Sequence, residues 1–430
     1  MTESNGADAS PTKAIVGDTV WSAVAEASKL ISSIVTFLFV ARALGATPFG
    51  LLAGIAALVN MVSPFAGLGA PLLMLQRIRH DDQPLDVAFA TAVTMTVLGG
   101  TAAILFVTIL GSIVIPQVSI AVIVVLAVGD FLFGGVLQLC SGVAIAASEM
   151  RWYALVVALP NVTRLAAAGL FVALDHSSIL LWAGLQLAVL GVTVVVVVSL
   201  LCVRFGVRFS RGSIAKRDLV DGLPYSASVA AFSAQDGLDK PLMVRYGWGV
   251  DAGYYAAAYR IPSLAFMPVQ ALIIATLNRT FSAGRAGVGA ALALAKRLMI
   301  PALVYSLAIA LVIVTCAPLF EPLLGDSFEG AVPIVRWLAF LPVLRTLQYF
   351  PANALTGAGR QRLRLVILLV TLAVNLVACL VLIPHWSWRG ALAATFVAET
   401  VYAVMLWAAA LRLAALERKA SPLSTAEVHT

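Results

Sequence analysis

The chain has few charged residues for its length. Asp, Glu, Lys and Arg make up 11% of its 430 residues, whereas 61% are hydrophobic and the mean hydropathy is +0.99. A soluble domain carries about 25% charged residues, and a soluble surface of this apolar composition would aggregate. The composition therefore excludes a soluble protein and predicts an all-α polytopic membrane protein, because helices satisfy their own backbone hydrogen bonds in lipid.

Cysteine and histidine are also scarce, with four of each. The cysteines lie singly in apolar segments, without the spacing of a disulfide framework or a metal site. The histidines form no pattern typical of a metal site or a catalytic triad. Long polar segments are missing too, since the longest covers 204–218 and cannot hold a soluble catalytic domain. We therefore predict a transporter rather than an enzyme, with no catalytic residues, metal or cofactor.

Apolar windows of about 20 residues, the length needed to cross a bilayer, define about twelve segments. Their approximate limits are 15–41, 48–76, 85–110, 117–148, 152–174, 177–203, 219–245, 252–280, 290–318, 331–357, 364–384 and 389–412. The segment 219–245 is the least hydrophobic of them. It is kept because an internal repeat requires a span at that position.

The internal repeat joins the first half of the chain to the second. Arg42–Gly50 precedes one apolar segment, and roughly 200 residues later Arg245–Tyr255 precedes another. Duplicated hydropathy is typical of two-lobed transporters. We therefore predict two pseudo-symmetric six-helix lobes, 15–203 and 219–416. The linker 204–218 joins them, and the tails 1–14 and 417–430 flank them.

Basic residues are distributed unequally between the two sides of this predicted topology. With the amino terminus in the cytoplasm, 19 Lys and Arg residues fall on the cytoplasmic side and three, Arg42, Arg245 and Arg389, on the opposite side. Cytoplasmic loops of membrane proteins carry this excess. We predict a multi-pass protein of the bacterial cytoplasmic membrane with both termini in the cytoplasm. The net charge of +7 is thereby explained without nucleic acid as a partner.

Charged residues inside the apolar segments are candidates for function, because an ionisable group in hydrocarbon is costly. Glu26 and Lys29 are three residues apart, and Asp236 and Lys240 are four apart, so each pair can meet on one helical face. The pairs lie in the first and seventh segments, which the repeat makes equivalent. Together with Asp239, they are either structural ion pairs or a site for a coupling proton or sodium ion. Two further carboxylates within the segments, Asp130 and Glu399, receive no predicted role.

Arg164, Arg260 and Arg345 have no acidic residue within their own turn of helix. A guanidinium at this depth needs a counter-charge from another helix or from a substrate phosphate, which its planar fork binds bidentately. We predict substrate contact for all three. Tyr254, Tyr255 and Tyr259, near the start of the eighth segment, are either an interfacial belt or part of a cavity wall that meets sugar.

Four groups of residues resemble motifs of the polysaccharide-biosynthesis flippases of the multidrug/oligosaccharidyl-lipid/polysaccharide exporter superfamily. They are Ala41–Gly45 with Phe49-Gly50; Asp239-Lys240 followed by Gly253–Pro262; Leu324-Gly325 with Ala354–Gln361; and Leu382–Pro384 followed by Arg389–Ala394. The groups occur in the family's order and extend the resemblance over most of 15–412.

The resemblance implies two six-helix lobes that give alternating access to a cavity lined by basic residues. The implied cargo is a polyprenyl-pyrophosphate-linked oligosaccharide, which moves from the inner to the outer leaflet. Arg260 and Lys29 fall in cavity-lining spans of the family, whereas Glu26 or Asp236 and Asp239 would respond to H⁺ or Na⁺. Polysaccharide-assembly proteins and membrane lipids are the further partners. The two additional carboxyl-terminal spans of lipid II flippases are not predicted, which favours an oligosaccharide-lipid flippase.

Three other functions stay open. A drug/cation antiporter of the same superfamily would share the fold but favour an acidic cavity. A membrane glycosyltransferase or ligase would need a large outer loop with acidic residues, and the predicted outer loops are short. A scaffold without transport activity is the third.

Overall fold

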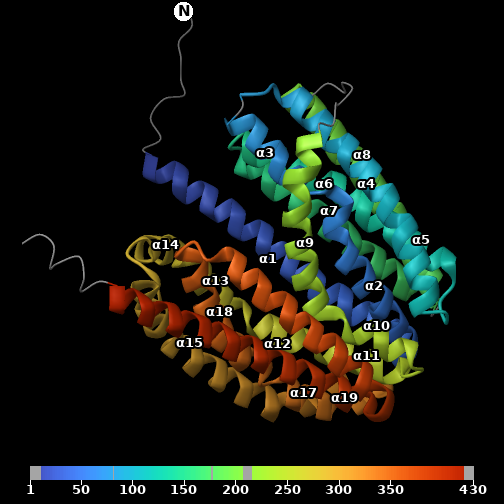
Figure 1. Ribbon diagram of the computed structural model, residues 1–430. Helices are drawn as coiled ribbons and strands as arrows, with labels where there is room; N and C mark the ends of the chain where they lie inside the picture. The colour runs from blue at the N-terminus through green and yellow to red at the C-terminus, as the bar shows by residue number, and fades with distance from the viewer. Residues whose placement is uncertain (1–10, 81, 176–177, 207–215, 421–430) are drawn as a thin grey trace, which may run out of the picture. The chain divides into compact units, whose positions relative to one another are not determined.

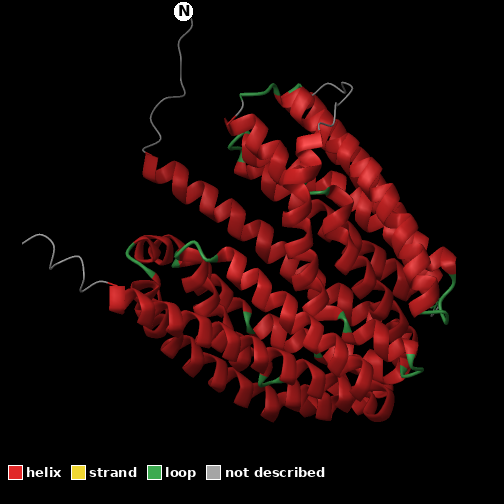
Figure 2. Ribbon diagram, viewed as in Figure 1, coloured by secondary structure: helices red, strands yellow, loops and turns green. Residues whose placement is uncertain are grey.

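In the computed structural model, the residues described are 11–80, 82–175, 178–206 and 216–420. They form helices joined by short turns, and no strand occurs among them (Figure 2). The all-helical fold predicted from composition is therefore confirmed. Most of the predicted tails, 1–14 and 417–430, and of the linker 204–218 lies outside the described residues.

The chain packs as two compact units. Unit 1 comprises Met1–Leu44 and Leu58–Ala230, and unit 2 comprises Gly45–Ala57 and Ala231–Thr430. The chain therefore enters unit 2 for a short stretch before completing unit 1. The predicted lobes, 15–203 and 219–416, are limits in the sequence and stay a prediction.

Unit 1 is built from long apolar helices (Figure 1). They are α1 (Pro11–Leu44), α2 (Ala46–Gly67, here from residue 58), α3 (Ala70–His80), α4 (Leu85–Val114), α5 (Ile120–Val128), the π-helical turn η1 (Gly129–Gly134), α6 (Gly135–Ala146), α7 (Met150–Ala173), α8 (Ile179–Phe205) and α9 (Lys216–Gly237, here to residue 230). α1 packs lengthwise against α7. A core from α3, α4, α6, α7 and α8 includes Met74, Phe89, Met95, Leu139 and Val197.

The ends of α8 illustrate how local sequence defines these helices. The Ser178 hydroxyl accepts a hydrogen bond from the Leu181 amide, 3.4 Å away, which caps the first turn. At the other end Gly206 adopts φ +65°, the left-handed conformation that glycine reaches without strain. Between these signals the helix is predominantly apolar and rich in Leu and Val, as a membrane span requires.

Unit 2 contains shorter, interrupted helices. They are the first part of α2, the last part of α9, α10 (Asp239–Arg245), α11 (Gly249–Ala258), α12 (Arg260–Ala265), α13 (Met267–Ala275), α14 (Leu277–Arg285), α15 (Val288–Cys316), η2 (Ala317–Leu319), α16 (Phe320–Leu324), η3 (Asp326–Ala331), α17 (Val332–Leu338), α18 (Leu341–Gly357) and α19 (Gln361–Ala420). α15, α18 and α19 pack together (Figure 1). Several breaks coincide with proline, which lacks the amide donor and therefore starts a new helix: Pro268, Pro333 and Pro342 lie in the first turns of α13, α17 and α18.

Two glycines explain why the start of α2 belongs to unit 2. A Cβ on Gly50 would collide with the backbone carbonyl of Gly249, and a Cβ on Gly253 would collide with the carbonyl of Ala46. The helices α2 and α11 thus approach at backbone contact, which side chains larger than hydrogen would prevent. Both glycines belong to the motifs that carry the family resemblance.

The number of membrane-crossing helices differs from the expected twelve segments. Among the described residues, nine helices are long and apolar enough to cross a membrane, or ten if the bent pair Asp326–Leu338 and Leu341–Gly357 is one span. The expected eleventh and twelfth segments, 364–384 and 389–412, are merged in α19. The expected seventh, 219–245, is divided between α9 and α10 and is not among the apolar spans, which agrees with its low hydropathy.

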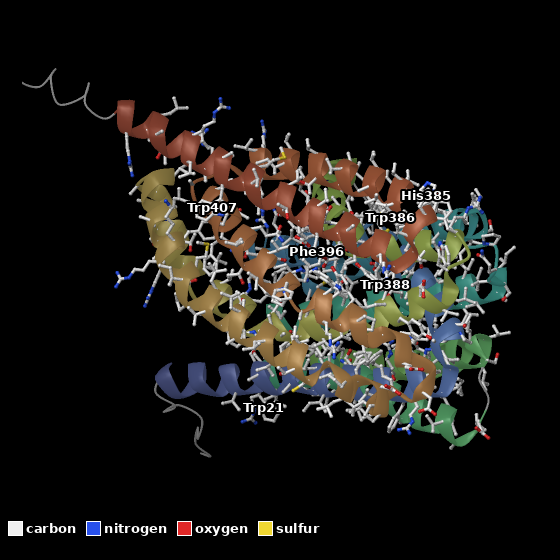
Figure 3. All side chains as sticks on the ribbon, turned by 90° about the horizontal axis from the view of Figure 1, so that it is seen from below. Trp21, His385, Trp386, Trp388, Phe396 and Trp407 are labelled. Atoms are coloured by element: carbon white, nitrogen blue, oxygen red, sulfur yellow. The ribbon has the colours of Figure 1, made fainter. Side chains whose placement is uncertain are left out.

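α19 contains the break that separates its two expected segments. Ser387 has φ 49° and ψ −126°, outside the helical region. Its hydroxyl hydrogen-bonds Asp251 of α11. His385, Trp386 and Trp388 gather around this break, whereas Trp407 lies well along the following helical stretch (Figure 3).

Candidate functional site

A buried charge cluster in unit 2 centres on Arg345 of α18. The Arg345 side chain is only 9% exposed. Its Nη2 donates hydrogen bonds to Asp236 Oδ1, at 2.5 Å, and to the Tyr259 hydroxyl, at 2.6 Å. Its Nε lies 3.7 Å from Glu399 Oε1 of α19. Four separate stretches of chain therefore meet at one guanidinium, which presents the fork of donors suited to several acceptors.

Lys240 forms the second cationic centre of the cluster. Its Nζ donates to Asp239 Oδ1, at 3.1 Å, and to the backbone carbonyl of Asp236, at 3.0 Å. The same ammonium lies 4.1 Å from the ring centroid of Tyr259 and 5.7 Å from that of Tyr255. A cation over aromatic faces is stabilised by the negative charge of the ring π-systems. The rings of Tyr255 and Tyr259 and the carboxylate of Asp239 therefore together stabilise this buried ammonium.

Neutral polar groups complete the hydrogen bonding around the two cations. The Tyr255 hydroxyl lies 3.0 Å from Thr395 Oγ1, and Thr395 donates to Asp239 Oδ2 at 3.5 Å. The Gln348 amide donates to Glu399. Buried polar groups are costly unless paired. α9, α10, α11, α18 and α19 each contribute to satisfying them here.

The cluster is unbalanced in charge. It holds the carboxylates of Asp236, Asp239 and Glu399 and the cations of Lys240 and Arg345, so it carries one net negative charge when all are ionised. The Asp236 side chain is 56% exposed, whereas the other four charged side chains are at most 12% exposed, so the imbalance lies at the edge of a buried cluster. One bound proton or one monovalent cation would remove it. The arrangement can therefore bind a single positive charge.

One sequence-predicted pairing is wrong. Asp236 and Lys240 were expected to pair through their side chains at helical spacing, but Lys240 reaches only the Asp236 backbone carbonyl. The physical reason is competition from other partners, because the Arg345 guanidinium lies within direct reach of Asp236 and the Asp239 carboxylate lies within direct reach of Lys240. The Asp236 carboxylate turns to Arg345 instead, and Lys240 pairs with Asp239.

Arg345 has no acidic residue within its own turn of helix, and its counter-charges come from Asp236 on α9 and Glu399 on α19. Arg260, where α12 begins, is exposed and directly follows Tyr259 of the cluster. Tyr255, for which the sequence allowed either an interfacial belt or a cavity wall, is fully buried. Tyr254 packs edge-on against Phe328, at 6.2 Å between ring centroids.

The predicted residues of unit 1 lie in two places. Lys29 and Glu26 contact each other on α1 as expected, with 4.0 Å between Nζ and Oε2, but each side chain is 61% exposed. Arg164 of α7 is exposed, and its charge acts on Asp130 of η1. Asp130 also accepts a hydrogen bond from the Ser63 hydroxyl of α2. Unit 1 therefore contains a buried carboxylate on which an arginine charge acts, and these two residues are called the unit 1 pair below.

Two participants of the unit 2 cluster, Glu399 and Gln348, were not predicted from the sequence, whereas Tyr259 was expected in an interfacial belt or a cavity wall and accepts a hydrogen bond from Arg345. Nothing in the local sequence distinguishes Glu399 from an interfacial residue, because its partners lie 51 and 54 positions away. Among the described residues, no group of His, Cys, Asp and Glu could hold a metal ion.

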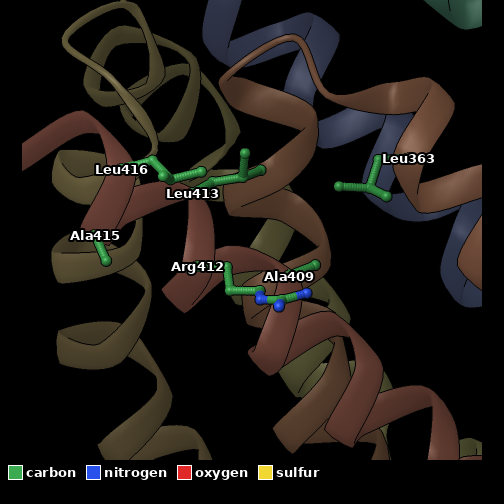
Figure 4. Close-up of a pocket in the computed structure, with 6 residues that line it drawn as sticks. All are labelled: Leu363, Ala409, Arg412, Leu413, Ala415 and Leu416. Atoms are coloured by element: carbon green, nitrogen blue, oxygen red, sulfur yellow. The ribbon is translucent and has the colours of Figure 1, made fainter. Parts of the chain in front are cut away.

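A pocket of about 540 Å³ lies at the carboxyl end of α19. Leucine and alanine side chains line it, and the Arg412 guanidinium lies across it (Figure 4). No residue of the charge cluster lines this pocket, so it is a separate feature of unit 2.

Comparisons with solved structures show the fold. The chain is similar to an inward-facing multidrug resistance MATE family transporter of the MOP superfamily, with a TM-score of 0.75 and 14% identity over 91% of this chain and 96% of the other. An outward-facing transporter of the same description gives 0.62 and 17% over 95% and 97%. A MOP superfamily transporter from Pyrococcus furiosus, described by a reverse polarity of its binding pocket that suggests a different function, gives 0.59 and 18% over 95% and 97%.

Sequence comparison identifies the family. No curated protein matches the chain. The family described as "Polysaccharide biosynthesis protein" matches residues 15–278, which is more than half of the chain. The chain is a multi-pass membrane protein with the fold of the transporters to which it is similar, and it belongs to the polysaccharide biosynthesis protein family.

Proposed function

We propose that the protein is a flippase that moves a polyprenyl-pyrophosphate-linked oligosaccharide from the inner to the outer leaflet of the bacterial cytoplasmic membrane. The observation that carries this proposal is the family match over 15–278. The exposed basic side chains of Lys29, Arg164 and Arg260 support it, because a pyrophosphate is a doubly anionic ligand that guanidinium and ammonium groups bind. Both termini face the cytoplasm in this proposal, and the spans number twelve in two six-helix lobes.

The proposed mechanism gives the basic residues one task, which is to compensate the pyrophosphate while the lipid tail stays in the bilayer. The headgroup is too polar to cross hydrocarbon alone, so the protein must replace its hydration. Arg260, helped by Lys29 and Arg164, neutralises the phosphates. Alternating access of the two lobes then exposes the cargo to the other leaflet. Arg345 contributes less directly, because Asp236 and Glu399 already engage it.

The unit 2 cluster is proposed as the group that responds to the coupling ion. Its single excess negative charge supports a role for Asp236, Asp239 and Lys240 in binding H⁺ or Na⁺. Gln348 supports a proton: its Oε1 is buried without a partner while its amide donates to Glu399. Rotating that amide by 180° would let Oε1 accept a hydrogen bond from a protonated Glu399. Glu26, exposed beside Lys29, is the weaker candidate for this role.

The proposal is tested by complementing a flippase-deficient strain while measuring which leaflet holds the lipid-linked oligosaccharide. The wild-type protein should clear the lipid-linked sugar from the cytoplasmic leaflet, and Arg260→Ala should let it accumulate. Arg336→Ala is the matched control, because Arg336 of α17 is another exposed arginine of unit 2 without a proposed role. If the wild-type protein never clears lipid-linked sugar, the flippase proposal fails.

A drug/cation antiporter is the second candidate, because the similar solved structures include multidrug resistance transporters. Resistance of the complemented strain to cationic drugs, without clearance of lipid-linked sugar, would favour it. A membrane glycosyltransferase or ligase would instead convert the lipid-linked sugar chemically, which the same extraction detects by mass.

A further inference from the structure

Asp130 lies where the helical pattern of unit 1 changes. α5, η1 and α6 form one candidate span, Ile120–Ala146, and η1 (Gly129–Gly134) is a π-helical turn near its middle. Such turns are rare and are found frequently at functional sites, because the widened turn alters the regular hydrogen bonding of the helix. A carboxylate at this depth is costly as an ion, and a group in this position calls for a functional explanation.

The carboxylate is only partly satisfied by its surroundings. The Ser63 hydroxyl donates a hydrogen bond to the Asp130 carboxylate. A Cβ added at Gly134 would lie 3.9 Å from Oδ1, in van der Waals contact with it. Oδ2 is inaccessible and has no hydrogen-bond partner among the described residues. η1 packs against α4, α5, α6 and α8. Among the described residues, the charge that acts on Asp130 is that of Arg164 on α7.

The unpartnered oxygen favours a proton over a metal ion. An ionised carboxylate would keep a buried oxygen without a protein donor, whereas the neutral acid places its proton on that oxygen. A metal cation would require several oxygen ligands, whereas Asp130 and Ser63 supply one carboxylate and one hydroxyl, which are too few. Arg164 stabilises the opposite state, because its positive charge favours the carboxylate. The unpartnered oxygen therefore favours the protonated form of Asp130, and the charge of Arg164 favours the ionised form.

We propose that Asp130 is a proton-binding site of unit 1 that alternates between a neutral acid and a carboxylate paired with Arg164. The proton is taken from water and returned to water, with no other bond made or broken. When Asp130 is neutral, the exposed Arg164 guanidinium loses a counter-charge and attracts another anion. If the proposed flippase function holds, that anion is the pyrophosphate of the cargo, so proton binding and cargo binding favour each other.

Carbodiimide labelling of the purified full-length protein in nanodiscs tests the proton site without any cargo. A hydrophobic carbodiimide forms a stable N-acylurea with protonated carboxyl groups in apolar surroundings, and peptide mass spectrometry locates the product. Labelling of Asp130 should fall with rising pH, by about tenfold per pH unit above its midpoint. Asp130→Asn should lose this labelled peptide, and the labelling of Asp236 and Glu399 in the same sample serves as the internal comparison.

Two variants test the geometry. Arg164→Gln removes the charge that favours the carboxylate, so the labelling midpoint should move to higher pH by about 1 to 3 units. Ser63→Ala should move it in the same direction by less, because it removes one hydrogen bond to the charged form. The proposal is overturned if wild-type Asp130 labels equally at every pH or not at all. It is also overturned if Arg164→Gln leaves the midpoint unchanged, or if Na⁺ suppresses labelling at constant pH.

The link to the cargo has a separate readout. Binding of a short polyprenyl pyrophosphate should weaken as the pH rises through the labelling midpoint in the wild-type protein and lose this pH dependence in Asp130→Asn. Labelling that titrates while no polyprenyl pyrophosphate binds at any pH would overturn the cargo assignment and leave the proton site standing.

Discussion

The two units bury their carboxylates in different ways. In unit 2, Asp236 and Glu399 both engage Arg345, and neighbouring hydroxyl and amide groups complete the network. In unit 1, Asp130 has the Ser63 hydroxyl, the charge of Arg164 and one oxygen without a donor. Neutralising or removing one group of the unit 2 network disrupts several interactions, whereas the same change at Asp130 or Arg164 disrupts one. The unit 2 cluster should therefore matter more for stability, and the unit 1 pair should change its protonation more easily.

The largest expected effect breaks the unit 2 network at its centre. Arg345→Ala should destabilise the protein by about 3 to 5 kcal/mol, because it leaves the buried carboxylate of Glu399 without its cation, while the exposed Asp236 loses its partner at smaller cost. Denaturant unfolding in detergent micelles measures this loss. Arg336→Ala, an exposed arginine on α17, is the control and should change little. Equal stability of the two variants would contradict the network as described.

A smaller effect is expected from removing one neutral member of the same network. Tyr259→Phe deletes the hydroxyl that accepts from Arg345 but keeps the ring beneath Lys240. The loss should be about 1.5 to 3 kcal/mol, the usual contribution of one hydrogen bond to a charged group. Unfolding midpoints should place this variant between the wild-type protein and Arg345→Ala. A loss as large as that of Arg345→Ala would mean that the ring position, not the hydroxyl, was disturbed.

The unit 1 pair supplies the direct comparison. Arg164→Gln should cost about 1 kcal/mol, the typical size of a single substitution. It should cost less than Arg345→Ala, because Asp130 can become neutral and Arg164 is exposed. The difference between the stability losses of Arg164→Gln and Arg345→Ala should narrow as the pH rises, because keeping Asp130 neutral then costs more free energy. Measuring both variants at acidic and alkaline pH checks this, and identical losses at every pH would remove the contrast between the units.

The smallest effect belongs to the exposed pair on α1. Lys29→Ala should change the unfolding free energy by less than about 0.5 kcal/mol, because both side chains are 61% exposed and 4.0 Å apart. Cargo transport is a separate readout, in which the proposed phosphate contact predicts a defect. A stability loss comparable with that of Tyr259→Phe would show that this pair is structural after all.

Local features of the chain were predictable because they act over one helical turn. The Glu26–Lys29 contact follows from a spacing of three residues, and most span limits follow from uninterrupted apolar runs. The Asp236–Lys240 prediction failed because it rested on spacing within one helix, whereas Asp236 meets Arg345 of another helix and Lys240 meets Asp239. The placement of Arg345 could not be predicted, since Asp236 is 109 positions away and Tyr259 is 86.

The amino-acid sequence by itself determined that this protein is an all-helical membrane protein, because apolar runs of about 20 residues cross lipid as helices, which satisfy their own backbone hydrogen bonds. It also determined where many helices begin and end, because proline and glycine act on their immediate neighbours. Only the tertiary structure decided which charges meet. A buried charge must find an opposite charge wherever packing brings one, and that distance in space is independent of distance along the chain.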